Sequence, residues 1–182
     1  MKAVRIVRMA ATMDIRSEDL NKSVDNVVER LTGISELYPV QLELLTALVT
    51  KENIIFTSAT NSGKTLPAVL YPSILEELVK LGYNVPSGKT LCITALNSIK
   101  LSMVSTVKAL GIMCEAVTFD NFKKVIPSSE VKVLFVSPEV LKIPQVSACL
   151  LAHRHAFVLK VIDEFHLGEL FFQLCLCRFV DA

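Results

Sequence analysis

The chain has 182 residues, of which 52% are hydrophobic, 20% are charged and 7% are aromatic, with a formal net charge of +1. This length fits one domain with a hydrophobic core, and the apolar content excludes a disordered tail. Six glycines and seven prolines exclude a collagen-like or linker composition. The near-neutral charge excludes a polybasic binder, so any nucleic-acid contact requires a local basic face.

The cysteines and the ends of the chain bear on its compartment. The five cysteines form no Cys-x-x-Cys pair, which argues against a disulfide framework and favours the reducing nucleus or cytoplasm. Basic residues interrupt the apolar start and weaken a secretory signal; a mitochondrial presequence is the alternative, because no acidic residue precedes Asp14. The apolar stretch 170–180 is shorter than the about 20 residues of a spanning helix. We therefore expect no membrane partner.

Apolar residues at helical spacing predict the helices. A first helix ends near Gly33, and a second is opened by Pro39, whose missing N–H costs little in a first turn. A third helix is expected from Lys64, bending or stopping near Pro72. The stripe at 96–110 predicts a fourth helix, which a glycine closes.

Short apolar runs between these helices predict buried strands, at 53–57, 90–94, 114–117, 131–136 and 157–162. Strands that alternate with helices imply parallel pairing through right-handed crossovers. The predicted fold is therefore α/β, a three-layer arrangement around a parallel sheet.

One segment between a predicted strand and a predicted helix reads Ser-Ala-Thr-Asn-Ser-Gly-Lys-Thr and matches a P-loop that lacks its first glycine. Backbone N–H groups and the helix N-terminus would surround phosphates, Lys64 would reach the β- and γ-phosphates, and the Thr65 hydroxyl would ligate Mg²⁺. Asn replaces a common glycine but tolerates positive φ. The predicted ATP-binding residues here are Thr60, Asn61, Ser62, Gly63, Lys64 and Thr65. The alternative is a chance Gly-Lys-Thr at a helix start.

The last predicted strand runs directly into Asp-Glu-Phe-His. Nucleotide sites in open α/β sheets lie at the carboxyl ends of strands, where the P-loop also falls. Asp163 is predicted to hold Mg²⁺, directly or through water, and Glu164 to polarise the attacking water. The alternative is an exposed charged turn after a buried strand.

Gly-Lys-Thr followed by Asp-Glu-x-His resembles the pattern of superfamily two helicases, and other segments resemble the RecQ family. The segment 37–41 is similar to the F-R-P-x-Q element, 94–100 with 108–112 to S-P-L-x-S-L-M…R-x-L-G-I, and 133–141 to x-L-x-Y-x-S-P-E-R-L. The resemblance covers about 37–166. It implies the RecA-like first motor lobe of an ATP-dependent 3′-to-5′ DNA helicase, with ATP and Mg²⁺ as cofactors and DNA, rather than RNA, as the partner.

The resemblance also implies roles for particular residues. Gln41 would read the adenine edge, Lys64 and Glu164 would serve catalysis, and His166 would couple the nucleotide to the DNA-binding segments. Contacts to nucleic acid would come from Thr94, Ser98, Lys100 and Ser137. The residues themselves leave simpler roles open: Gln41 can cap its own helix, Ser137 can cap a helix opened by proline, and Lys100 can lie on a solvated face.

The sequence departs from the RecQ pattern in several places. Phe165 replaces a small alanine, Ser102 and Met103 replace an Asp-Gln pair, and no W-G-H-x-F-R loop follows His166. The expected organisation is an N-terminal helical extension at 1–33, a helicase ATP-binding lobe at 34–168 and a divergent or truncated apolar tail at 169–182.

The chain also stops before a second motor lobe, and we expect that lobe in a full-length parent. Arginines of the second lobe stabilise the transition state, so hydrolysis by this chain should be weak and unwinding absent. The apolar end predicts a truncated gene model or a divergent exon. Two rival hypotheses remain: an RNA helicase lobe of the same superfamily, and a non-catalytic ATP-binding interaction module, which Asn61, Phe165 and the missing lobe favour.

Overall fold

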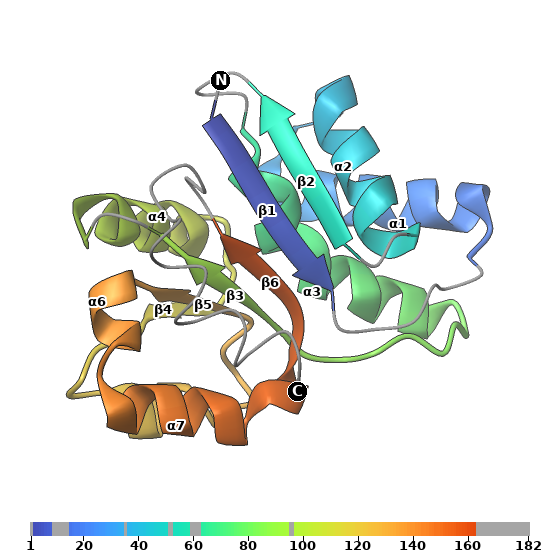
Figure 1. Ribbon diagram of the computed structural model, residues 1–182. Coiled ribbons are helices and arrows are strands. Elements are labelled where there is room, and N and C mark those ends of the chain that lie inside the picture. Colours follow the sequence, from blue (N-terminus) through green and yellow to red (C-terminus); the bar gives the residue numbers. More distant parts are fainter. Residues whose placement is uncertain are drawn as a thin grey trace.

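The computed structural model describes residues 2–8, 15–34, 36–50, 53–58, 63–94 and 97–162, with the backbone alone for 2–8, 53–58 and 97–99. Strands and helices alternate along this part of the chain (Figure 1). The strands are β1 (Lys2–Arg8), β2 (Asn53–Ser58), β3 (Lys89–Ile93), β4 (Cys114–Ala116), β5 (Val133–Val136) and β6 (Phe157–Ile162). The helices are α1 (Ser17–Thr32), α2 (Pro39–Thr50), α3 (Thr65–Lys80), α4 (Asn97–Ala109), α5 (Phe122–Val125), α6 (Pro138–Leu141) and α7 (Pro144–Ala152).

The sheet has the order β2-β1-β6-β3-β5-β4. The four strands β6, β3, β5 and β4 pair parallel, as predicted for an α/β fold. The expectation of a wholly parallel sheet was wrong, because β1 lies antiparallel between β2 and β6. The segment 1–33, expected to be a helical extension, thus contributes a strand to the sheet as well as α1.

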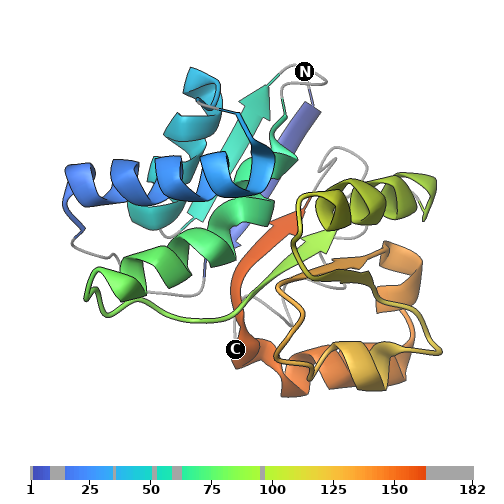
Figure 2. The same ribbon diagram turned by 180° about the vertical axis from the view of Figure 1, so that it is seen from behind.

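Two hydrophobic clusters cover the two faces of the parallel strands, and together they give the three layers expected from the sequence. One cluster joins α1, α2, α3 and α4 to Cys92, Phe135 and Leu159. The other joins α5, α6 and α7 to the intervening strand residues Leu91 and Leu134. Neighbouring residues of a strand point to opposite faces, so an uninterrupted apolar strand can serve both clusters. Figure 2 shows α1 and α3 in front of the sheet on the first of these faces.

Helix α3 continues through Pro72, where the sequence predicted a bend or a stop. A proline inside a helix removes a hydrogen bond and costs about 3 kcal/mol. Here Tyr71, Ile74 and Leu78 of the same helix are fully buried in the first cluster. Burial of a large apolar side chain contributes about 1.5–3 kcal/mol, so the packing of α3 offsets the cost of its proline.

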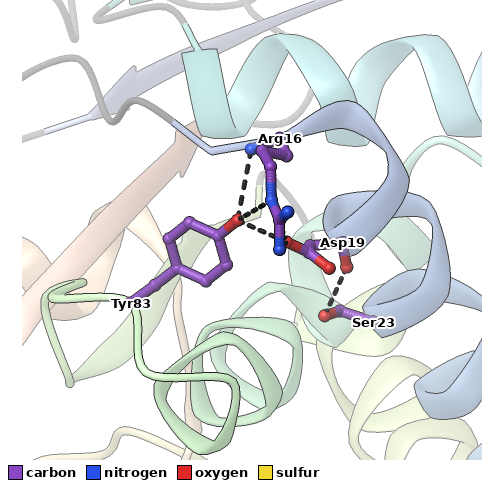
Figure 3. Close-up of polar contacts among 4 residues, drawn as sticks. All are labelled: Arg16, Asp19, Ser23 and Tyr83. Atoms are coloured by element: carbon purple, nitrogen blue, oxygen red, sulfur yellow. Dashed lines mark hydrogen bonds and ion pairs between the residues drawn. The ribbon is translucent and has the colours of Figure 1, made fainter.

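Hydrogen bonds and an ion pair connect the start of α1 to Tyr83, which follows α3 in the chain (Figure 3). The Tyr83 hydroxyl donates to Asp19 Oδ2 at 2.5 Å, and Arg16 Nε donates to the same carboxylate oxygen at 2.8 Å and to Tyr83 Oη at 3.3 Å. The hydroxyl of Ser23 donates to the carbonyl of Asp19 at 2.8 Å. The hydrogen bond from Tyr83, followed by the contact with Arg16, lowers the pKa of Asp19. This cluster holds the start of α1 beside the loop that leads to β3.

Candidate nucleotide-binding site

The candidate site lies at the sheet edge where β2 and β6 both end. Because β1 is antiparallel to both neighbours, β2 and β6 run in the same direction, and their last residues, Ser58 and Ile162, face one edge. Helix α3 begins at Thr65, seven positions after Ser58 in sequence. The predicted residues Thr60, Asn61 and Ser62 lie outside the described residues, as do Asp163, Glu164 and His166.

Gly63 leads the chain into α3 with φ at +69°. This left-handed conformation is easy for glycine and strained for other L-residues. The carbonyl of Gly63 accepts the N–H of Leu66 at 3.0 Å, which forms the first turn of the helix. Lys64 is the N-cap residue of α3, and Thr65 is half-buried at its first position. Since Leu66 donates its N–H to Gly63 and Pro67 has none, the N–H of Thr65, its hydroxyl and Lys64 are the groups of this first turn at the helix N-terminus, where phosphates bind in other proteins.

Gln41 is 4% exposed on α2, and its amide has a partner at each end. Its Oε1 accepts the backbone N–H of Tyr38 at 3.0 Å, so Gln41 caps its own helix, the simpler role that the sequence left open. Its Nε2 donates to the carbonyl oxygen of Gly63 at 3.1 Å. The residue that resembles the adenine-reading glutamine of RecQ helicases thus contacts Gly63, the glycine of the predicted P-loop. Adenine recognition by Gln41 stays a prediction.

The space around Gly63 is filled by Gln41. A Cβ atom added at Gly63 would lie 2.3 Å from Gln41 Nε2. Any larger residue would therefore push the amide away from the carbonyl that it bonds. Both the positive φ of Gly63 and the nearby amide of Gln41 therefore favour glycine at this position.

Tyr38 is a residue of this site that the sequence analysis did not single out. Tyr38 is 69% exposed. It directly precedes α2 and lies three positions before Gln41 in the sequence. Exposed aromatic rings offer flat apolar faces for the stacking of planar ligands. Tyr38 belongs to the Leu-Tyr-Pro-Val-Gln element of the sequence, but only the fold shows that it is exposed and close in sequence to Gln41, which contacts Gly63.

The predicted nucleic-acid contacts Thr94 and Ser137 follow the neighbouring strands β3 and β5. Ile93 pairs with Val136, and the N–H of Thr94 donates to the carbonyl of Val136 at 3.0 Å. Thr94 is 2% exposed and Ser137 is fully buried. Within the described residues neither side-chain hydroxyl has a hydrogen-bond partner, which is costly for a buried polar group. Ser137 precedes α6 and Pro138, but its hydroxyl does not cap that helix.

Lys100, the third predicted nucleic-acid contact, is 5% exposed rather than on the solvated face that was its simpler interpretation. Burial lowers the pKa of its ammonium group, while the nearby carboxylate of Glu139 raises it. Lys100 and Glu139 belong to α4 and α6, the helices that follow β3 and β5. The structure therefore brings the described members of this set to one sheet edge but buries them. The side chain of Ser98 lies outside the described residues.

A cavity of about 150 Å³ lies between α3 and α4, and no pattern in the sequence predicted it. Most of its lining is apolar, although Thr65 belongs to it; the lining residues are Thr65, Leu66, Val69, Ser102, Met103, Thr106, Val107 and Leu110. Two of them, Ser102 and Met103, are positions at which the sequence departs from the RecQ pattern. An apolar cavity does not suit phosphates, so this cavity is not a candidate for the predicted phosphate site.

No protein-family model matches the chain, and no curated protein matches it. Among the described residues, no helix combines the length and apolar character that a membrane span requires. Within the same ranges, no cluster of three or more His, Cys, Asp or Glu residues could hold a metal ion.

Proposed function

We propose that the chain is the ATP-binding lobe of a RecQ-like superfamily two DNA helicase, which binds Mg-ATP at the start of α3. The observation that carries this proposal is the hydrogen bond between Gln41 Nε2 and the carbonyl of Gly63. Two sequence elements that resemble successive nucleotide-binding motifs of one family meet in space, although they lie 22 residues apart. If the Gly-Lys-Thr sequence stood at the helix start by chance, a contact between it and the segment 37–41 would not be expected.

The residues at this helix start fit a nucleotide phosphate. The positive φ of Gly63 turns the chain into α3, and the helix dipole makes the N-terminus of α3 favourable for an anion. Lys64 would add a positive charge, and the hydroxyl of Thr65 is the kind of oxygen ligand that Mg²⁺ takes. When bound, Mg²⁺ neutralises phosphate charge. The roles proposed for Asp163 and Glu164 are metal binding and water activation.

The direct test is the affinity of the protein for a fluorescent ATP analogue in the presence of Mg²⁺. Lys64→Ala removes a charged hydrogen-bond donor and should weaken binding by about tenfold to a hundredfold. The matched control is Lys80→Ala, at the other end of α3, where the lysine pairs only with the adjacent carboxylate of Glu77 at the surface. Equal effects of the two substitutions, or no binding by the wild-type protein, would overturn the proposal.

One observation favours the second candidate, a non-catalytic ATP-binding interaction module. The described residues proposed to contact DNA, Thr94, Lys100 and Ser137, are all buried, so they cannot reach a phosphate backbone without a movement of α4 or α6. ATP turnover separates the two candidates. Turnover that Lys64→Ala or Glu164→Gln abolishes would rule out the non-catalytic module.

The nucleic acid is tested separately by competition between single-stranded DNA and single-stranded RNA of the same sequence. We propose that DNA binds more tightly, in keeping with the RecQ-like elements at 37–41 and 133–141. Tighter binding of RNA would favour the RNA helicase lobe instead. Failure to bind either strand, with ATP binding intact, would favour the interaction module.

A further inference from the structure

Helices α3 and α4 lie side by side on one face of the sheet (Figure 2), with the cavity of about 150 Å³ between them. Two of its lining residues, Val69 and Val107, are buried members of the first hydrophobic cluster. Two others, Ser102 and Thr106, are exposed on α4. The cavity therefore reaches from the surface into the core, and a small molecule can enter it from solvent.

The lining determines the polarity of a ligand. None of the described residues that line the cavity carries a charge, so a charged ligand would lose its hydration there without gaining an opposite charge. The hydroxyl of Thr106 donates to the carbonyl of Ser102 at 3.0 Å and is thus already bonded within α4. Met103 adds a thioether, which adapts its shape and makes favourable contacts with aromatic rings. The cavity suits an uncharged, apolar ligand.

The volume of the cavity determines the size of a ligand. In other proteins, apolar cavities of about 150 Å³ stay dry and bind a single benzene molecule. Water binds poorly in such a cavity because it needs two to four polar partners. A molecule with one six-membered ring is therefore about the largest that the cavity can enclose.

Two of the lining residues are positions at which the sequence departs from the RecQ pattern. Ser102 and Met103 stand where that pattern has an Asp-Gln pair. A carboxylate and an amide at these positions would make the lining polar and charged. The apolar lining is therefore a property of this chain that the resemblance does not imply.

We propose that this cavity binds a small uncharged apolar molecule, about the size of one aromatic ring, and that this binding strengthens nucleotide binding at the start of α3. Thr65, Leu66 and Val69 line the cavity from the beginning of α3. A ligand supplies van der Waals contacts that these side chains lack across the empty space, and so stabilises the helix start that holds the phosphates. The effect on the nucleotide rests on the proposed function, whereas the binding of the apolar molecule does not.

The test uses toluene as the probe and the methyl groups of Val69, Met103 and Val107 as NMR reporters in the full chain. Toluene should shift these signals saturably, with a dissociation constant of about 1 mM or below. Benzoate, which joins the same ring to a negative charge, should not shift them. Ser102→Asp should weaken toluene binding by about fivefold to tenfold, because it places a carboxylate on the lining. The matched control is Ser105→Asp, at an exposed position of α4 outside the lining, which should leave toluene binding unchanged within about twofold.

The effect on the nucleotide is measured with a fluorescent ATP analogue and Mg²⁺. Saturating toluene should tighten binding of the analogue by about fivefold. Because such coupling is reciprocal, the analogue should tighten toluene binding by the same factor.

The outcomes distinguish this inference from the proposed function. The absence of a saturable shift, equal shifts with toluene and benzoate, or equal weakening by the two aspartate variants would overturn the binding site. Toluene binding that leaves the affinity for the ATP analogue unchanged would overturn the link to α3. If the wild-type protein binds toluene but no nucleotide, the proposed function and the link fail, and the apolar binding site stands.

Discussion

Gln41 Nε2 donates a hydrogen bond to the carbonyl oxygen of Gly63, and a Cβ atom on that glycine would lie 2.3 Å from the same nitrogen. The amide of Gln41 thus occupies the space that a side chain at Gly63 would need. Its oxygen is held at the same time by the N–H of Tyr38. The start of α2 and the start of α3 are therefore coupled through one side chain.

This coupling can be measured with a double-mutant cycle. Gly63→Ala should lower the free energy of unfolding by about 1–2 kcal/mol through backbone strain and by about 1 kcal/mol more through the displaced hydrogen bond. In a Gln41→Ala background only the strain should remain. Urea unfolding of the two single variants and the double variant gives the coupling energy directly.

The control for this cycle is Gly33→Ala. Gly33 has the same φ of +69°, but nothing lies within 4 Å of an added Cβ. Its substitution should cost the strain alone, and Gln41→Ala should not change that cost. A cycle at Gly63 with no coupling energy would mean that Gln41 moves aside freely.

The second prediction concerns the buried hydroxyl of Thr94. Thr94→Val removes a hydroxyl that has no partner within the described residues and should raise the free energy of unfolding by about 1 kcal/mol. Thr90→Val is the matched control on the same strand, because the Thr90 hydroxyl donates to the carbonyl of Ala68 at 2.9 Å. That variant should be destabilised by about 1 kcal/mol. Equal destabilisation of both variants in urea unfolding would show that the Thr94 hydroxyl is satisfied after all.

Thr94→Val also tests whether Thr94 contributes to the binding of nucleic acid. If Thr94 contacts nucleic acid, Thr94→Val should bind single-stranded DNA more weakly although it is more stable. A gain of stability with unchanged DNA binding would remove Thr94 from the nucleic-acid site. The measurement is a fluorescence anisotropy titration of labelled DNA.

The third prediction concerns the contacts of Asp19 at acidic pH. The hydrogen bond from Tyr83 and the contact with Arg16 lower the pKa of Asp19 below its ordinary 3.8. The stability that Asp19 contributes is therefore fully present above about pH 4 and is lost as the pH falls below that value. Asp19→Asn and Tyr83→Phe should each make the free energy of unfolding less dependent on pH in this window. Urea unfolding between pH 3 and pH 6 measures this dependence, and a pH dependence that stays the same in both variants would contradict the assignment.

The fourth prediction concerns the reactivity of the described cysteines. Burial raises the pKa of the Cys114 thiol to about 11, and the residue is fully buried. Only the thiolate is nucleophilic, so Cys114 should react with iodoacetamide only when the chain opens, and its rate should rise with urea. Cys149, which is half-buried, should react sooner. Peptide mapping by mass spectrometry gives both rates, and labelling of Cys114 ahead of Cys149 without denaturant would be inconsistent with the packing.

Most of the parallel strands and the helices between them could be predicted, because the sequence patterns that indicate these elements lie within short segments. Apolar spacing and the glycines at 33 and 111 predicted the end of α1 and both ends of α4 to within one residue. Continuous apolar runs gave β3, β5 and β6, since strands buried on both faces need no alternation. Strand β1 was missed because its seven residues include three cations, and its two partners lie far away in sequence.

The candidate site was predicted less well, because its properties depend on packing. The identity of Gln41 and Gly63 as site residues came from motifs, but their mutual contact depends on how α2 and α3 lie on the sheet. The burial of Thr94, Lys100 and Ser137 depends on how α4 and α6 cover the ends of β3 and β5. The spacing of residues in the sequence does not indicate how these helices pack on the sheet.

The position of β1 between β2 and β6 also bears on the order in which the chain can assemble on the ribosome. Among the described strands β1 is synthesised before the others, yet one of its two partners is β6, the last of them. Pairings between such distant segments form slowly, because a long loop must close before they contribute any stability. Until β6 emerges from the ribosome, β1 can pair only with β2 and keeps one edge of unsatisfied backbone groups, the kind of edge that recruits foreign strands. Nascent chains that end before Phe157 should therefore depend on chaperones more than the finished protein does.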